Sequence, residues 1–104
     1  MAAPWNPPVR AEDFRTFVAL EDYANPGTFK AAPTIAAGDF MVSKDGGSFA
    51  NLTTLPSVAP SAQEMVQIDL SGTEMTADVV VIRCKDQTAP PEWAPLILTI
   101  NTTA

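Results

Sequence analysis

The chain has 104 residues, of which 46% are hydrophobic, and its formal net charge of −6 arises from six basic and twelve acidic side chains. This length suits one domain with a single core, and the hydrophobic content excludes wholesale disorder. The basic residues form no cluster, which argues against nucleic acid as a partner, and no apolar stretch approaches the roughly 20 residues that cross a bilayer. The single cysteine excludes an internal disulfide.

Residues 1–12 predict an extended N-terminal arm, and residues 13–104 predict one β-sandwich domain. Three prolines in Met1–Val9 surround Trp5 and prevent this segment from forming a central strand. Trp5 either folds back onto its own core or docks on a neighbouring subunit, and the prolines lower the entropic cost of docking. The candidate interface residues are Trp5, Pro7, Pro8 and Val9. The start of the chain lacks the basic and apolar regions of a signal peptide, so we expect synthesis in a cytoplasm.

Short segments that alternate apolar and polar residues predict strands along the rest of the chain. The predicted strands are Asp13–Leu20, Asp39–Lys44, Ser48–Leu52, Glu64–Leu70, Asp78–Lys85 and Trp93–Asn101. Asp78–Lys85 is apolar on both faces up to Arg83, which is typical of a central strand. With a short extended piece at Thr34–Ala37, the spacing predicts an all-β sandwich of about seven strands.

The second and third of these strands predict a β-hairpin around Asp45-Gly46-Gly47, where glycine supplies positive φ without steric cost. The turn holds either two residues or three residues with a bulge. This choice decides whether Phe49 or Ala50 joins the core.

The sequence also predicts the turns and loops that connect the other strands. Asn25-Pro26-Gly27 predicts a turn, and Thr53–Ala62 predicts a loop with two prolines. Ser71 followed by Glu74 matches a capping box, which predicts one short helical turn between two strands. The predicted core residues are Phe40, Val42, Val66, Ile68, Leu70, Val79, Val81 and Leu98.

The sequence offers little chemistry. Without histidine it lacks the commonest general base and most zinc sites. Cys84 lies in a predicted buried strand and is interpreted as a core side chain. Calcium is a further alternative, but the aspartates lack the spacing of a dedicated site, so we expect no metal or cofactor. The aspartates considered are Asp39, Asp45, Asp69, Asp78 and Asp86. An aromatic platform of Trp5, Tyr23 and Trp93 is the alternative for carbohydrate binding, although Trp93 is better explained at the rim of the core.

Three segments of the sequence resemble those of a known protein family. They are TFKAAPTIAAGDFMVSKDGGSFANLTTLPSV (Thr28–Val58), IDLSGTEMTADVVVI (Ile68–Ile82) and the opening Trp5-Asn6-Pro7-Pro8-Val9. Over nearly its whole length the chain is similar to small virion proteins of tailed bacteriophages. The resemblance implies an immunoglobulin-like sandwich that is built into the head, neck or tail of the particle, with no catalytic motif.

The expectation is therefore a non-enzymatic structural subunit of a tailed-phage virion. We expect it to be made in the cytoplasm of the bacterial host, to assemble as a symmetric homo-oligomer and to contact other virion proteins, because a lone sandwich has exposed edge strands that an assembly can cover. The alternative is a carbohydrate-binding module that helps the virion hold the surface of its host.

Overall fold

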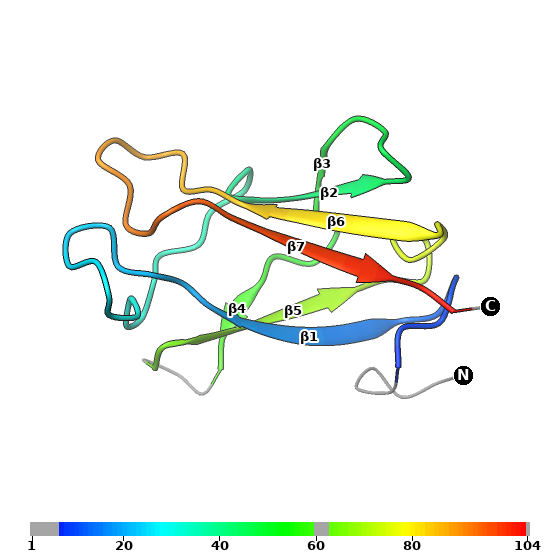
Figure 1. Cartoon of the computed structure of the whole chain (residues 1–104), viewed down its shortest axis with the longest axis horizontal. Coiled ribbons are helices and arrows are strands. Elements are labelled where there is room, and N and C mark those ends of the chain that lie inside the picture. Colours follow the sequence, from blue (N-terminus) through cyan, green and yellow to red (C-terminus); the bar gives the residue numbers. More distant parts are fainter. Residues whose placement is uncertain (1–6, 60–62, 104) are drawn as a thin grey trace.

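In the described part of the chain, seven antiparallel strands form two sheets that pack face to face (Figure 1). The computed structural model describes residues 7–59 and 63–103. The strands are β1 (Phe14–Ala19), β2 (Phe40–Lys44), β3 (Ala50–Asn51), β4 (Ser57–Val58), β5 (Met65–Leu70), β6 (Val79–Cys84) and β7 (Leu96–Asn101). No helix occurs within the two described ranges, and the predicted all-β sandwich of about seven strands is confirmed.

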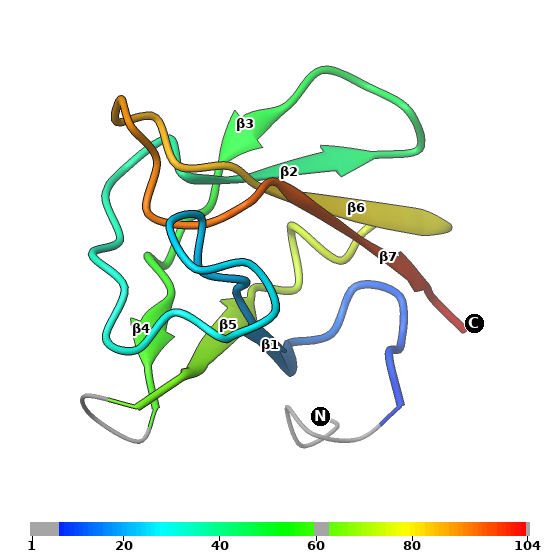
Figure 2. The same cartoon turned by 60° about the vertical axis from the view of Figure 1, so that its left-hand side comes forward.

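The strand order is β1-β5-β4 in one sheet and β3-β2-β6-β7 in the other. Figure 2 shows the two sheets as separate layers. In the four-stranded sheet, β6 places Ile82 opposite Val42 on one side and opposite Leu98 on the other. The central position predicted for Asp78–Lys85 is therefore confirmed.

The core lies between the two sheets and consists of the side chains on their inner faces. Five of the predicted core residues are buried, as the alternation in their strands requires. These residues are Phe40, Val42, Val66, Ile68 and Leu70. Leu98, which was also predicted, is half-buried and packs against this core, whereas Ile100 is the buried residue of β7.

The prediction for β6 is wrong by one residue. Its fully buried side chains are those of Val80, Ile82 and Cys84. Val79 and Val81 are only half-buried and face outward. Four consecutive apolar residues show no alternation, so the period cannot indicate which of them face the core. Pairing with β2 decides the register, because it aligns Ile82 with the buried Val42.

The β2–β3 hairpin turns at Asp45 and Gly46, whose φ angles are 50° and 78°. Positive φ at both central residues, together with a 2.9 Å backbone hydrogen bond that closes the turn, makes this a two-residue type I′ turn. Strand pairing resumes with Val42 opposite Ala50, which leaves one extra residue on the β3 side. The loop is therefore the two-residue alternative, with a bulge beside it, but the expectation that Phe49 or Ala50 joins the core is wrong, because both are exposed.

Between β5 and β6, Ser71 and Glu74 form the predicted capping box. The Glu74 carboxylate accepts the Ser71 N–H at 2.9 Å, and the Ser71 hydroxyl accepts the Glu74 N–H at 3.2 Å. The Met75 N–H donates to the Ser71 carbonyl at 3.0 Å and closes a single turn. The second Glu74 oxygen accepts the Thr53 N–H at 2.9 Å, so the same carboxylate also fixes the loop after β3.

Candidate functional site

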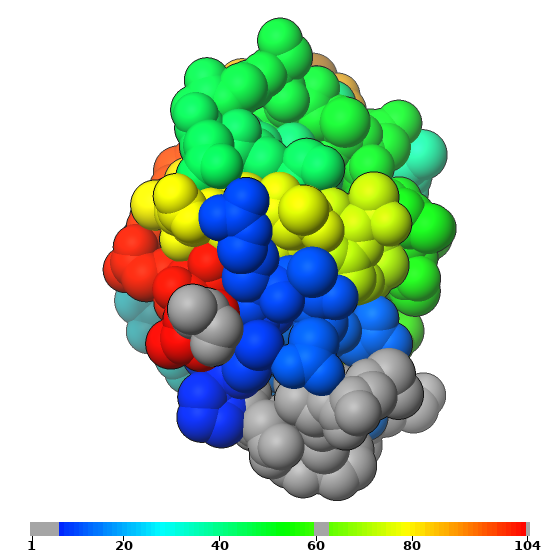
Figure 3. Space-filling view, turned by 90° about the vertical axis from the view of Figure 1, so that its right-hand side faces the viewer, coloured from blue at the N-terminus to red at the C-terminus, as the bar shows by residue number. Residues whose placement is uncertain are grey.

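The described part of the N-terminal arm lies beside the end of β7. Trp5 lies outside the described residues, Pro7 is exposed, and Pro8 and Val9 are half-buried. The Pro8 carbonyl accepts the Thr103 N–H at 2.8 Å, and the Thr103 carbonyl accepts a second backbone N–H, also at 2.8 Å. Figure 3 shows this blue segment between the red end of the chain and the yellow residues that precede and begin β6. Pro8 and Val9 are therefore anchored on their own domain at the base of the arm.

The same segment also packs against the Ser71–Glu74 turn. The Ala11 N–H donates to the Met75 carbonyl at 3.1 Å, and the Asp13 carboxylate accepts the Gly72 N–H at 3.0 Å. A Cβ atom on Gly72 would lie 2.7 Å from the Ala11 carbonyl oxygen. This close approach requires glycine, because any larger residue would push the N-terminal segment away.

The aromatic platform considered for carbohydrate binding is not assembled in the described structure. Trp93 is fully buried rather than at the rim of the core, and its ring lies 6.0 Å from that of Phe40. Its indole N–H donates to the Cys84 carbonyl at 3.3 Å, which satisfies the one polar atom that burial would otherwise leave without a partner. Tyr23 is exposed but has no described aromatic neighbour on such a platform.

Cys84 is a core side chain, as predicted, and is fully buried at the end of β6. Burial raises the pKa of its thiol to about 12. The thiol therefore stays protonated at neutral pH, and the thiolate is the form that acts as a nucleophile or a metal ligand.

The aspartates considered for calcium accept hydrogen bonds from the chain itself. They are Asp39, Asp45, Asp69, Asp78 and Asp86. Burial alone raises the pKa of Asp86, but three hydrogen bonds from Thr88 and Glu92 outweigh it and hold that pKa below the ordinary value. Within residues 7–59 and 63–103, no group of three or more His, Cys, Asp or Glu side chains is placed to hold a metal ion.

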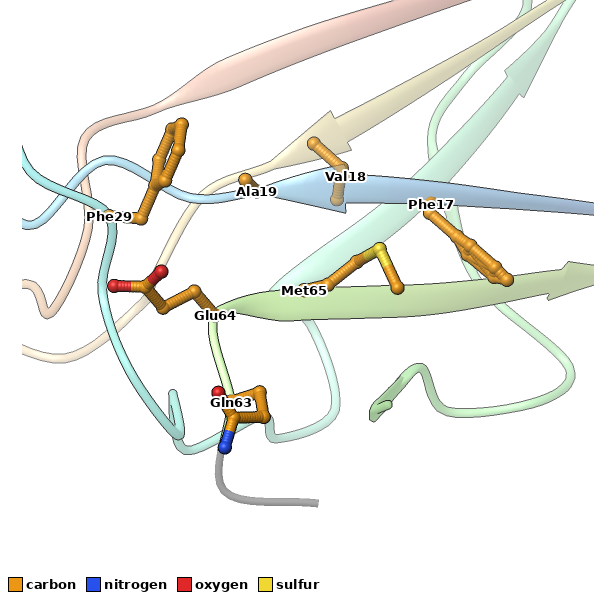
Figure 4. Close-up of a pocket in the computed structure, with 7 residues that line it drawn as sticks. All are labelled: Phe17, Val18, Ala19, Phe29, Gln63, Glu64 and Met65. Atoms are coloured by element: carbon orange, nitrogen blue, oxygen red, sulfur yellow. The ribbon is translucent and has the colours of Figure 1, made fainter. Parts of the chain in front are cut away.

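A hollow of about 530 Å³ opens on the outer face of the β1-β5-β4 sheet (Figure 4). Its lining residues, here called the Phe17 groove, are Phe17, Val18, Ala19, Phe29, Gln63, Glu64 and Met65. Three large apolar side chains are exposed together there, with exposed fractions of 41% for Phe17, 56% for Phe29 and 38% for Met65. A cluster of this kind on a surface is typical of an interaction site.

The two strands of the groove position their side chains by alternation. Val18 and Val66 face the core, so Phe17 and Met65 point outward from β1 and β5. Figure 4 shows these two side chains on the same face of the sheet, with Glu64 at the end of the groove nearest Phe29.

Phe29 reaches the groove through the predicted Asn25-Pro26-Gly27 turn. Gly27 has a φ of 92°, and the Thr28 N–H donates to the Asn25 carbonyl at 3.2 Å, which is the pattern of a type II turn with proline before glycine. The chain then returns along the end of β1, where Phe29 forms a bridge with Glu21. Sequence patterns missed this residue because it lies in a polar segment without alternation.

Comparisons with protein-family models, curated proteins and solved structures find no match for this chain. In the part of the chain that the structure describes, no helix is long and apolar enough to cross a membrane. The interpretation of function therefore depends on the sequence phrases and on the surfaces described above.

Proposed function

We propose that this protein is a non-enzymatic structural subunit of a tailed-phage virion, which assembles as a symmetric homo-oligomer on the head, neck or tail. The resemblance of its sequence phrases to small virion proteins supports the setting. The observation that carries the interface role is the exposed Phe17 groove. Apolar side chains gathered on a surface favour burial against a partner, and a symmetric assembly supplies one at every position.

We also propose that the sandwich is of the immunoglobulin type. In the lettering of that fold, β1, β5 and β4 take the places of strands B, E and D, and β3, β2, β6 and β7 take those of C′, C, F and G. The chain departs from antibody domains at two points. It has one cysteine and thus no disulfide between the sheets, and its buried Trp93 precedes the last strand instead of lying on strand C.

The setting is tested by locating the chain in purified phage particles. Mass spectrometry should detect it in the particle, and cryo-EM should place it at symmetry-related positions on the head, neck or tail. Its absence from the particles would contradict the proposal. Binding of a monomeric chain on a glycan array would instead favour the carbohydrate-binding alternative.

The role of the groove is tested with two matched aromatic variants. Phe29 and Tyr23 are similarly exposed, at 56% and 52%, but only Phe29 lines the groove. Sedimentation velocity should show that Phe29→Ser weakens self-association, whereas Tyr23→Ser leaves it unchanged. Equal behaviour of the two variants would remove the groove from the interface.

A further inference from the structure

Arg83 lies at the centre of the outer face of the β3-β2-β6-β7 sheet. Strand pairing places it between Met41 on β2 and Ile97 on β7. Its guanidinium carbon lies 4.7 Å from the centre of the Phe49 ring, and Nη2 donates to the Met41 sulfur at 3.0 Å. The Nε atom is buried and has no hydrogen-bond partner. The cation is thus partly removed from water and surrounded by apolar groups.

The other two arginines of the chain have carboxylate partners. Arg10 pairs with Asp78, and Arg15 pairs with Asp69. No ion pair to Arg83 occurs within the described residues, so its charge is held only by a thioether and an aromatic ring. A guanidinium in this state gains free energy when a partner brings a carboxylate, and arginine on an aromatic ring is a frequent anchor of protein interfaces.

The Phe17 groove has the complementary chemistry. Glu64 stands at one end of it and is exposed (Figure 4), and no hydrogen bond or ion pair holds its carboxylate within the described residues. The groove is hollow and largely apolar, whereas the Arg83 side presents Ile97, a large apolar side chain that is 54% exposed. The two surfaces therefore carry opposite charges, and each exposes large apolar side chains.

We propose that the face formed by Met41, Phe49, Arg83 and Ile97 binds the Phe17 groove of a second copy of this chain. Arg83 pairs with Glu64 of that copy, and Ile97 enters the hollow. This inference rests on the proposed homo-oligomeric function. The two surfaces belong to different sheets, so each copy uses both, and the contact is of the head-to-tail type that closes into a ring when the rotation between copies allows it.

Charge reversal at each side tests the contact. Sedimentation velocity should show that Arg83→Glu and Glu64→Arg each weaken self-association about tenfold or more, because like charges then meet in an apolar surround. Mixing the two single variants should restore association between unlike copies, as heterodimers or alternating even-numbered rings, since the reversed sites match each other and the untouched sites still match. Lys44→Glu, the same change of charge on an exposed residue at the far end of β2, should have no effect. Circular dichroism checks that each variant is folded.

The outcomes separate this contact from the proposed function. A wild-type chain that is monomeric at all concentrations would overturn both. An oligomer that survives both reversals, or single variants that stay dissociated after mixing, would overturn the Arg83–Glu64 contact alone. The presence of the chain in virions would be unaffected by either of these results.

Discussion

The Asp45 carboxylate accepts the backbone N–H of Val79 at 3.0 Å and so joins the tip of the β2–β3 hairpin to the start of β6. The same oxygen accepts the Asp78 N–H at 3.0 Å, and the Asp45 N–H donates to the Val79 carbonyl at 2.9 Å. An aspartate in a tight turn commonly bonds the backbone of that same turn. The structure instead uses its side chain to hold the turn against the neighbouring strand.

Substitutions at Asp45 should separate these two roles. Asp45→Asn should change the free energy of unfolding by less than about 0.5 kcal/mol, because asparagine keeps an acceptor oxygen and tolerates positive φ. Asp45→Ala should cost about 1–3 kcal/mol, because two backbone N–H groups lose their acceptor. Urea titration measures both values. Equal effects of the two changes would mean that the contact with β6 contributes nothing.

The second central residue of the turn should tolerate only small or polar replacements. Gly46 has a φ of 78°, and a Cβ there would meet no atom within 4 Å, so the backbone angle alone decides the cost. Gly46→Val should destabilise the fold by about 2 kcal/mol, and Gly46→Asn by much less, because asparagine enters the left-handed region more readily. Thermal unfolding of the two variants gives the comparison. If valine melts like the parent, the type I′ turn is wrong.

Neighbouring residues on β6 should respond very differently to truncation. Ile82→Ala should cost about 3 kcal/mol, because Ile82 is fully buried and its removal leaves a cavity. Val81→Ala should cost about 1 kcal/mol or less, because Val81 is half-buried on the outer face. The order of the two values in a denaturant titration reports the register of the strand, and the reverse order would restore the register that the sequence predicts.

Acid should destabilise the protein partly through Asp86. Hydrogen bonds from Thr88 and Glu92 hold its pKa below the ordinary value, even though burial acts in the opposite direction. The folded state therefore binds a proton less readily than the unfolded state, so this stabilisation is present above about pH 4 and is lost as the pH falls further. Urea titrations from pH 7 to pH 3 should give a flatter dependence for Asp86→Asn than for the parent. Parallel curves would show that Asp86 contributes no such linkage.

Alternation of apolar and polar residues along the strands predicts most of this fold. In β5, apolar residues at every second position predict the buried Val66, Ile68 and Leu70, and the structure agrees. In β6 the same reasoning fails, because valine or isoleucine occupies four positions in a row and the face is chosen by pairing with β2. Pairing between distant segments carries no local signal. The sequence also does not predict β4. Its two residues lie between prolines, and only pairing with a distant strand makes them a strand.

The candidate surfaces are less predictable than the core. The outward direction of Phe17 follows from alternation, but its neighbour Phe29 comes from a turn in a polar segment. Trp93 follows Pro90 and Pro91, which favours a position at the rim of the core, yet it is fully buried by contacts with Phe40 and the Cys84 carbonyl. The burial of Trp93 depends on Phe40, which is far away in the sequence, whereas the position of Phe29 depends on a nearby turn that leaves no apolar pattern.

A short truncation of the N-terminal arm should weaken assembly without destabilising the fold. The described contacts of the arm begin at Pro8, whose carbonyl bonds Thr103. Deletion of residues 2–6 keeps these contacts and removes Trp5. If Trp5 docks on a neighbouring subunit, the free energy of unfolding should change by less than about 0.5 kcal/mol. Because an aromatic side chain on a proline-stiffened segment suits an interface anchor, the same deletion should weaken self-association or incorporation into particles.

A longer deletion provides the contrast. Removing residues 2–11 also takes away the backbone hydrogen bonds to Thr103 and Met75, and should cost about 2 kcal/mol or more of stability. Urea titration measures folding, and sedimentation velocity measures assembly. If the short deletion already lowers stability as much as the long one, Trp5 belongs to the core of its own domain. If the short deletion folds and assembles like the parent, the arm is dispensable and the interface lies on the sheet faces, where Arg83 and the Phe17 groove are found.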